Sequence, residues 1–433
     1  MSTGGENLRA SHKALMLGSA LFLLGAAPSA AADVTFESWS PLVQTTNKMV
    51  EVTQAKFPDI KIKSKIFNYP DYIVDLPTRA ASGDMADIIG LEPGALTQQY
   101  RKFLMPLQDC AAKTWGPDWK DKLYPISVDQ LRLGNPPGDE NFYGLPILTQ
   151  TINLWYTVPV LKDAGVAPPK NYDELLKAAK ILTEKGYGPL LVGLGDGWPR
   201  RDIYMQLIHD IAPGLIYKAE VGEAKFTDKP FVDAMKWWKR FFDDGIFQPG
   251  ALGLSQYPNA ADLIEGGRAG MFAMGAWWQQ EATRENPPPL AVGMNGFEPM
   301  KFPDLTGKGA PDDLLGGIDV MLGVSKSAKD PEAACKVVTD WVSGAGAQAL
   351  INTFNDLPAW KGMAPQVYVS DHQKEVWHIL TDEWLPKVKY ARQLRSPAIK
   401  QAFEDGLAAV ASGEETPEKA MANIQAVAEK EKK

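Results

Sequence analysis

Short apolar segments with the character of β-strands alternate along this chain with longer amphipathic segments that carry helix caps. The strand-like segments are residues 34–39, 60–66, 86–91, 188–194, 269–275 and 319–325. The best-marked helix follows the N-cap residue Asn171, has Glu174 three positions later and ends at Gly186; another follows Asp330. This alternation predicts an α/β fold. Because 433 residues exceed what one hydrophobic core serves, we expect two or three domains.

The first 32 residues have the pattern of a secretory signal peptide. A basic stretch ending at Lys13 precedes the apolar run 14–27, which leads to the small-residue triplet Ala30–Ala32. Cleavage there leaves Asp33 as the first residue of the mature protein. The apolar run is shorter than the ~20 residues that a membrane-spanning helix needs, and no cysteine lies near the cut. We therefore expect a periplasmic protein without a lipid anchor.

The net charge limits the possible partners, and the two cysteines raise the question of a disulfide. The net charge is −8 and no basic run interrupts it, so a nucleic acid or an anionic membrane is not expected as a partner. Cys110 and Cys335 would enter an oxidising compartment, where they could form a disulfide or remain two small buried side chains. The sequence leaves both possibilities open.

Motifs that would indicate catalysis or a cofactor are missing. After removal of the signal peptide, three histidines remain, none in a metal-binding pattern, and there is no C-x-x-C pair. No G-x-S-x-G motif occurs, and the "TGKG" segment at 306–309 lacks the upstream glycine of a P-loop. We expect no metal and no cofactor. A glycosidase remains open, because its two carboxylates meet only in the folded chain.

Several segments follow one another in an order found in a known family. They are residues 34–39, 83–96, 143–183, 226–245, 272–278, 316–335 and 355–360. Together they resemble the family 1 extracellular solute-binding proteins of ABC importers, a maltose-binding-protein-like group that binds sugars. The sequence departs from the family pattern at one place: the crossing strand usually continues "YYNK", and here Tyr156 is followed by Thr157-Val158-Pro159.

The resemblance implies a type II periplasmic-binding-protein fold, with two α/β lobes joined by three chain crossings. The implied boundaries give an N-terminal lobe of residues 33–146 with 316–355 and a C-terminal lobe of residues 147–315 with 356–433. The crossings are expected near Pro146–Thr149, Pro311–Gly317 and Asn355–Pro358. The segment 285–317, rich in proline and glycine, is expected to be irregular. Ligand would lie between the lobes.

Candidate ligand-binding residues follow the predicted strands. They are Trp39 and Ser40, Glu92, Trp198, and the adjacent pair Trp277 and Trp278. Ligands of open α/β sheets bind outside the carboxyl ends of the strands, so these side chains are expected to meet. Rings beside a carboxylate suit a sugar, whose C–H face stacks on an aromatic ring while its hydroxyls form hydrogen bonds.

Roles within this set differ. On a strand or tight turn, Trp277 and Trp278 point opposite ways, and we expect Trp277 to face the ligand and Trp278 to pack, although both could be core residues. The resemblance implies that Glu92 binds sugar hydroxyls. Weaker candidates near a crossing or a strand end are Tyr69, Asp319 and Asn355.

The leading hypothesis is therefore a binding protein that delivers a carbohydrate or sugar-derived polyol to the permease subunits of an ABC importer, acting as a monomer. One alternative ligand is a polyol phosphate or another anionic solute. It would need clustered arginines, which Arg200 with Arg201, or Arg392 with Arg395, could provide. The other alternative is a secreted glycosidase that uses Glu92 and a second acid.

Overall fold

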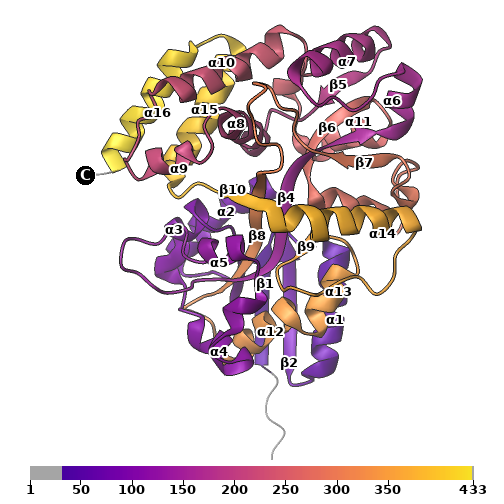
Figure 1. The fold of residues 1–433 in the computed structure, drawn as a ribbon. Helices are drawn as coiled ribbons and strands as arrows, with labels where there is room; N and C mark the ends of the chain where they lie inside the picture. Colours follow the sequence, from indigo (N-terminus) through magenta and orange to yellow (C-terminus); the bar gives the residue numbers. More distant parts are fainter. Residues whose placement is uncertain (1–31, 432–433) are drawn as a thin grey trace, which may run out of the picture.

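A computed structural model describes residues 32–431, so the predicted signal peptide lies outside the described residues except for Ala32. Within this range ten strands form one connected sheet (Figure 1). They are β1 (Ala32–Ser38), β2 (Ile60–Ile66), β3 (Ile88–Leu91), β4 (Leu145–Thr157), β5 (Gly188–Leu191), β6 (Ala269–Gly275), β7 (Phe297–Met300), β8 (Leu314–Val324), β9 (Leu357–Pro358) and β10 (Val388–Ala391). The expected α/β architecture is confirmed.

Helices lie between the strands along the chain. They are α1 (Val43–Lys56), α2 (Tyr69–Ser82), α3 (Ala95–Tyr100), α4 (Gln108–Trp115), α5 (Pro125–Gln130), α6 (Val158–Ala164), α7 (Tyr172–Glu184), α8 (Gly197–Ile211), α9 (Leu215–Glu220), α10 (Lys229–Asp243), α11 (Ala261–Glu265), α12 (Pro331–Ser343), α13 (Ala345–Ile351), α14 (Asp371–His378), α15 (Pro397–Ser412) and α16 (Pro417–Glu431). None of the helices between residues 32 and 431 combines the length and apolar character needed to cross a bilayer.

Two expected helix caps are present. The Asn171 side chain accepts a hydrogen bond from the backbone N–H of Glu174 at 3.0 Å, at the start of α7. The Asp330 side chain accepts one from the N–H of Ala333 at 2.9 Å, at the start of α12. Each bond satisfies a backbone donor that the first turn of a helix leaves without a partner, which explains why both helix starts could be predicted.

The sheet has the order β2-β1-β3-β8-β4-β6-β5. Strands β2, β1 and β3 are parallel to one another, as are β5 and β6, whereas β3, β8, β4 and β6 pair in antiparallel fashion. The two long strands β4 and β8 therefore stand in the middle of the sheet and join two parallel groups of strands. Figure 1 shows them running between a lower half, with α1, α12 and α13, and an upper half, with α7, α10 and α16.

The segments expected as chain crossings come together on β4. Thr149 pairs with Leu357 of β9, and Gln150 pairs with Gly317 of β8. The register of β4 shifts between Pro146 and Thr149, and Gly317 has a positive φ of 103°. These irregularities mark the part of the sheet where the chain passes between the two halves.

Buried apolar side chains form two cores. One surrounds β1, β3 and α12 and contains Phe36 and Trp341, and the other surrounds α8, α10 and α15 and contains Trp238 and Phe403. The first core also includes Phe272 and residues of the segment 376–388, so it extends beyond residues 33–146 and 316–355. The lobe boundaries derived from the resemblance stay a prediction.

Part of the chain is more regular than expected. The segment 285–317 was expected to be irregular, yet it contains β7, and β8 begins at Leu314 instead of 319. Strand β7 includes Pro299 and pairs with β4 in antiparallel register, and β10 adds a short parallel strand beside β8. Proline and glycine content predicts a loop, but pairing with a long central strand supplies the hydrogen bonds that order these residues.

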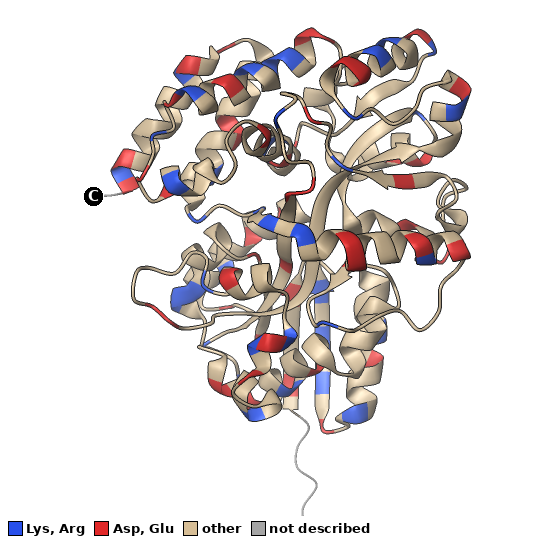
Figure 2. Cartoon of the chain, viewed as in Figure 1, with Lys and Arg blue, Asp and Glu red and all other residues tan. Residues whose placement is uncertain are grey.

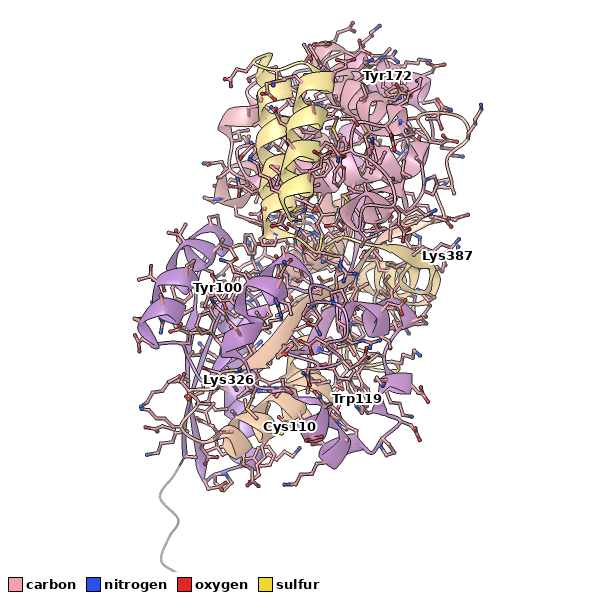
Figure 3. The ribbon with its side chains drawn as sticks, turned by 90° about the vertical axis from the view of Figure 1, so that its left-hand side faces the viewer. Tyr100, Cys110, Trp119, Tyr172, Lys326 and Lys387 are labelled. Atoms are coloured by element: carbon pink, nitrogen blue, oxygen red, sulfur yellow. A yellow bond between two sulfur atoms is a disulfide. The ribbon has the colours of Figure 1, made fainter. Side chains whose placement is uncertain are left out.

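Cys110 and Cys335 form a disulfide, which the sequence had left open. It joins α4 to α12 across 225 residues of sequence; Cys110 is labelled in Figure 3. Figure 2 shows that Lys and Arg are interspersed with Asp and Glu along the chain in both halves of the molecule.

Candidate functional site

A cleft of about 690 Å³ opens at the ends of several strands. Its walls come from two parts of the chain that are distant in sequence, residues 39–92 and 196–284, together with Asp319, Asn355 and Arg392. The sequence-predicted residues that line it are Trp39, Ser40, Tyr69, Glu92, Trp198, Trp277, Asp319 and Asn355. Folding thus brings together the residues that follow separate strands.

Trp198 and Trp277 form an aromatic corner in this cleft. Trp277 follows β6 and Trp198 lies in the first turn of α8, with ring centroids 5.9 Å apart and the rings inclined at 66°. The Arg392 guanidinium lies 5.3 Å from the centroid of each ring. The Trp277 ring also packs against Gly275, where a Cβ atom would lie 2.0 Å from the ring, so a side chain at position 275 would displace it.

Trp278 lies outside this cleft, which corrects its inclusion among the ligand-binding candidates. Its side chain is fully buried between Phe272, at 5.0 Å between ring centroids, and Phe297, at 5.5 Å. Trp277 and Trp278 are the second and third residues of the 3₁₀ helix η5 (Ala276–Thr283), in which adjacent side chains point in different directions. The structure therefore puts Trp277 in the cleft and Trp278 in the core.

Glu92 is the central acidic group on the opposite wall. It follows β3, is 4% exposed and accepts hydrogen bonds from the Tyr69 hydroxyl at 2.8 Å and from Gln393 Nε2 at 2.9 Å. Lys400 Nζ lies 3.5 Å from Oε2, the oxygen that also accepts from Tyr69. Burial raises the pKa of Glu92, but Lys400, Arg201 and Arg392 outweigh burial, so the pKa lies below its ordinary value. Glu92 is therefore an anion and accepts hydrogen bonds.

Aromatic side chains line the same wall, and a glycine follows Glu92 closely in the chain. The Trp39 ring stands edge-on to Tyr69, with centroids 5.3 Å apart. Next to Glu92, the backbone N–H of Ala95 donates to the Leu394 carbonyl at 2.8 Å. Gly94 permits this approach, since a Cβ atom there would lie 2.2 Å from the Leu394 oxygen. This contact joins the start of α3 directly to the segment before α15.

Asp319 and Arg392 form an ion pair at the floor of the cleft. Arg392 binds Asp202 with two nitrogens, Nε at 3.0 Å from Oδ1 and Nη2 at 2.9 Å from Oδ2, and its Nη1 lies 3.5 Å from Asp319. Burial raises the pKa of Asp319 to about 7; Arg392 opposes this, while Glu92 and Asp202 add to it. Asp319 thus titrates near neutral pH and can donate or accept a hydrogen bond.

Asn355 and Ser40 join two segments at another edge of the cleft. Asn355 Nδ2 donates to the Ser40 hydroxyl at 3.2 Å, and its Oδ1 accepts from the N–H of Leu42 at 2.9 Å. Asn355 is 3% exposed, so it reaches the cleft chiefly through the groups that it orients.

Sequence reasoning missed several residues of the cleft wall. They are Asp71, Asp196, Ser255, Tyr257, Gln280, Glu281 and Arg284. Most of them come from turns or from η5, whose direction a strand-end rule does not give. Gln280, Glu281 and Arg284 lie three to seven positions beyond Trp277, and this proximity was the available signal.

The charge of the cleft argues against an anionic ligand. Of the carboxyl groups that line it, Glu92 is ionised, and the two guanidiniums in its lining are already paired, Arg284 with Glu265 and Arg392 with Asp202. Arg200, Arg201 and Arg395, which the anion hypothesis would need, are not among its lining residues: Arg201 pairs with Glu404, and Arg200 and Arg395 donate to backbone carbonyls. Among residues 32–431, no group of three or more His, Cys, Asp or Glu side chains is arranged to hold a metal ion.

A sheet with two parallel groups of strands joined by long antiparallel strands, and an aromatic, acidic cleft at the strand ends, defines a solute-binding protein. The chain belongs to the bacterial extracellular solute-binding protein family, whose model matches residues 39–349. The family is defined by solute binding and not by catalysis, so the glycosidase alternative has no support.

Three known proteins illustrate the similarity. The multiple sugar-binding protein of Streptococcus mutans is 22% identical over 325 residues, which cover 74% of this chain and 73% of that protein. The structure of a chitin oligosaccharide binding protein matches with a TM-score of 0.78 and 23% identity over 93% of this chain and 99% of its own. The maltotriose-bound maltose/maltodextrin-binding domain MalE of Bdellovibrio bacteriovorus matches with a TM-score of 0.72 and 15% identity, covering 92% and 99%. These likenesses confirm the periplasmic-binding-protein fold expected from the sequence.

Proposed function

We propose that this chain is the carbohydrate-binding component of an ABC importer and holds a sugar or oligosaccharide in the cleft. The observation that carries the proposal is the aromatic corner of Trp198 and Trp277 in one cleft with the carboxylates of Glu92 and Asp319. Stacking binds the apolar face of a pyranose, and carboxylates accept hydrogen bonds from its hydroxyls. The names of the Streptococcus and chitin-oligosaccharide relatives and the maltotriose bound by MalE support the same ligand class.

The residues of the cleft have different roles in binding. Trp277 and Trp198 supply the stacking surface, with Trp39 and Tyr69 on the facing wall. Glu92 stays ionised because three cationic side chains surround it, so it acts as an acceptor. Further polar groups at the cleft are Asp319, Asn355 and Ser40. Arg392 is held by Asp202 and is thereby a fixed donor at the floor.

The proposal includes transport. Two lobes, residues 33–146 with 316–355 and residues 147–315 with 356–433, would close on the sugar by bending at the segments that meet on β4. The closed protein would then deliver its ligand to the permease subunits. We further propose that the mature protein acts in the periplasm as a monomer.

A thermal-shift screen tests the proposal. The glucose, xylose and N-acetylglucosamine series, each as monomer, dimer and trimer, are compared with polyol phosphates and amino acids. A ligand at 100 times its Kd adds about 2.7 kcal/mol to the free energy of unfolding. We expect neutral saccharides to raise the melting temperature and to be recovered uncleaved. Stabilisation by phosphorylated compounds alone would refute the carbohydrate assignment, and cleavage of the sugar would refute the binding role.

A further inference from the structure

The cleft continues beyond the aromatic corner to a second group of side chains that the proposed function does not use. Tyr257 comes from an irregular turn before α11, whereas Gln280 and Glu281 belong to η5 and Arg284 follows it. We call these four residues the η5 wall. It adjoins the aromatic corner directly, because Trp277 Nε1 donates to the Tyr257 hydroxyl at 2.9 Å.

Tyr257 lines the cleft beside Trp277. Its hydroxyl accepts the bond from Trp277 and lies 3.6 Å from Met274 Sδ, so the polar end of the side chain is held in place. The residue is nevertheless 41% exposed and lines the cleft. Exposing an aromatic ring to water costs free energy, and exposed rings are typical of binding surfaces.

Gln280 and Glu281 are buried, and three of their side-chain oxygens form no hydrogen bond, although Glu281 is paired with Arg284. Gln280 is 7% exposed and Glu281 is fully buried, yet Gln280 Oε1 and both Glu281 oxygens have no hydrogen bond within the described residues. Arg284 Nε lies 2.6 Å from Glu281 Oε2 without hydrogen-bonding geometry, and Arg284 also binds Glu265 at 3.1 Å. Buried polar atoms without partners are costly, and each calls for an explanation.

We propose that the η5 wall is a second saccharide subsite, so that the natural ligand has at least two sugar units. This inference rests on the proposed function. The first unit occupies the aromatic corner, and the second stacks on Tyr257 and places its hydroxyls against Gln280 and Glu281. The added sugar supplies the donors that these buried oxygens lack, and this recovers the cost of their burial.

The protonation of Glu281 fits an uncharged ligand. Burial raises the pKa of Glu281 to about 8; Arg284 opposes this shift and Glu265 adds to it. At neutral pH the group is therefore mostly a neutral carboxylic acid with one donor and one acceptor. A hydroxyl has the same two functions, whereas a phosphate or an ammonium group would find no matching charge in Glu281.

Isothermal titration with a saccharide series tests the subsite. Affinities are measured for the monomer, dimer and trimer of glucose, xylose and N-acetylglucosamine, using wild type, Glu281→Ala, Glu281→Gln and Gln280→Ala. We expect the wild type to gain about tenfold or more from monomer to dimer. Glu281→Ala and Gln280→Ala should lose most of this gain while monomer affinity stays within about twofold. Glu281→Gln keeps an uncharged donor and acceptor of the same shape, so this variant should retain the gain in affinity from monomer to dimer.

Controls and outcomes separate the subsite from general damage. Gln279→Ala, which changes a neighbour that does not line the cleft, should leave the gain intact. Thermal melting checks the folding of each variant, and Gln280→Ala carries the test if Glu281→Ala does not fold. An undiminished gain in the alanine variants, equal loss for monomer and dimer, or no gain in wild type would each overturn the subsite. Binding of no saccharide at all would instead refute the proposed function, and the subsite with it.

Discussion

Replacing Trp277 by alanine removes the side chain on which the aromatic corner depends. Its ring contacts Trp198 at 5.9 Å and lies 5.3 Å from the Arg392 guanidinium, and its Nε1 binds the Tyr257 hydroxyl. A central aromatic anchor contributes about 2 kcal/mol or more to binding, which is about thirtyfold in Kd. The stability cost comes from one aromatic pair, at about 0.5–1.5 kcal/mol, and one hydrogen bond, at about 1 kcal/mol.

The matched control is Trp278→Phe. Trp278 is adjacent in sequence but fully buried between Phe272 and Phe297, so its truncation leaves a cavity in the core and no change in the cleft. Isothermal titration with the saccharide found by screening gives affinity, and urea unfolding of the ligand-free protein gives stability. Trp277→Ala should lose affinity about thirtyfold with a modest loss of stability. Trp278→Phe should lose stability and keep its affinity within about threefold.

Two results would refute this reasoning. If folded Trp277→Ala binds sugar as the wild type does, the ring is not a stacking surface and Trp277 belongs to the core. If both substitutions reduce affinity in proportion to the loss of stability, the effect of Trp277 comes through the fold and not through contact with the ligand.

Three further predictions concern the scaffold. The double substitution Cys110→Ser/Cys335→Ser opens a link across 225 residues and should cost up to about 5 kcal/mol in the chain-entropy model, seen as a lower melting temperature with unchanged sugar affinity. Burial lowers the pKa of His209 to about 3, so between pH 6.5 and 3 the unfolded chain binds a proton that the folded chain does not. The free energy of unfolding should therefore fall as the pH is lowered from 6.5 to 3, by up to about 1.4 kcal/mol per pH unit. His209→Gln should remove this part of the slope. Arg392→Met should cost about 3–5 kcal/mol in urea unfolding because it strands the buried Asp202 carboxylate, and Arg392→Met/Asp202→Leu should recover much of the loss.

Strands and caps were predictable where the signal is local. The alternating Ile and Lys of residues 60–66 predicted β2, and Asn171 predicted the start of α7, because side-chain periodicity and capping act within a few residues. Strands β7 and β10 were not predicted. They are ordered by pairing with β4 and β8, and such partners are distant in the sequence.

The site was predictable to the extent that it follows strands. Trp39, Glu92 and Trp277 were found because parallel strands carry their carboxyl ends to one edge of a sheet. Tyr257 and Glu281 were missed because a turn and a 3₁₀ helix direct them, and no periodic pattern fixes the orientation of such elements. Arg392 was considered for an anion, but its pairing with Asp202, 190 residues away, changes its role from anion binding to fixing the floor of the cleft.

The hydrogen bond from Ala95 to Leu394 exists because position 94 has no side chain. Any larger residue there would push the start of α3 away from the segment before α15. The cleft side chains of Trp277, Glu92 and Asp319 would be unchanged. If the two proposed lobes close on the sugar through this contact, a protein altered in this way would bind sugar without closing fully. If the permease recognises only the closed form, uptake of the sugar would stop although every group that contacts the sugar is unchanged. Growth on the sugar would then measure the effect of a substitution at Gly94.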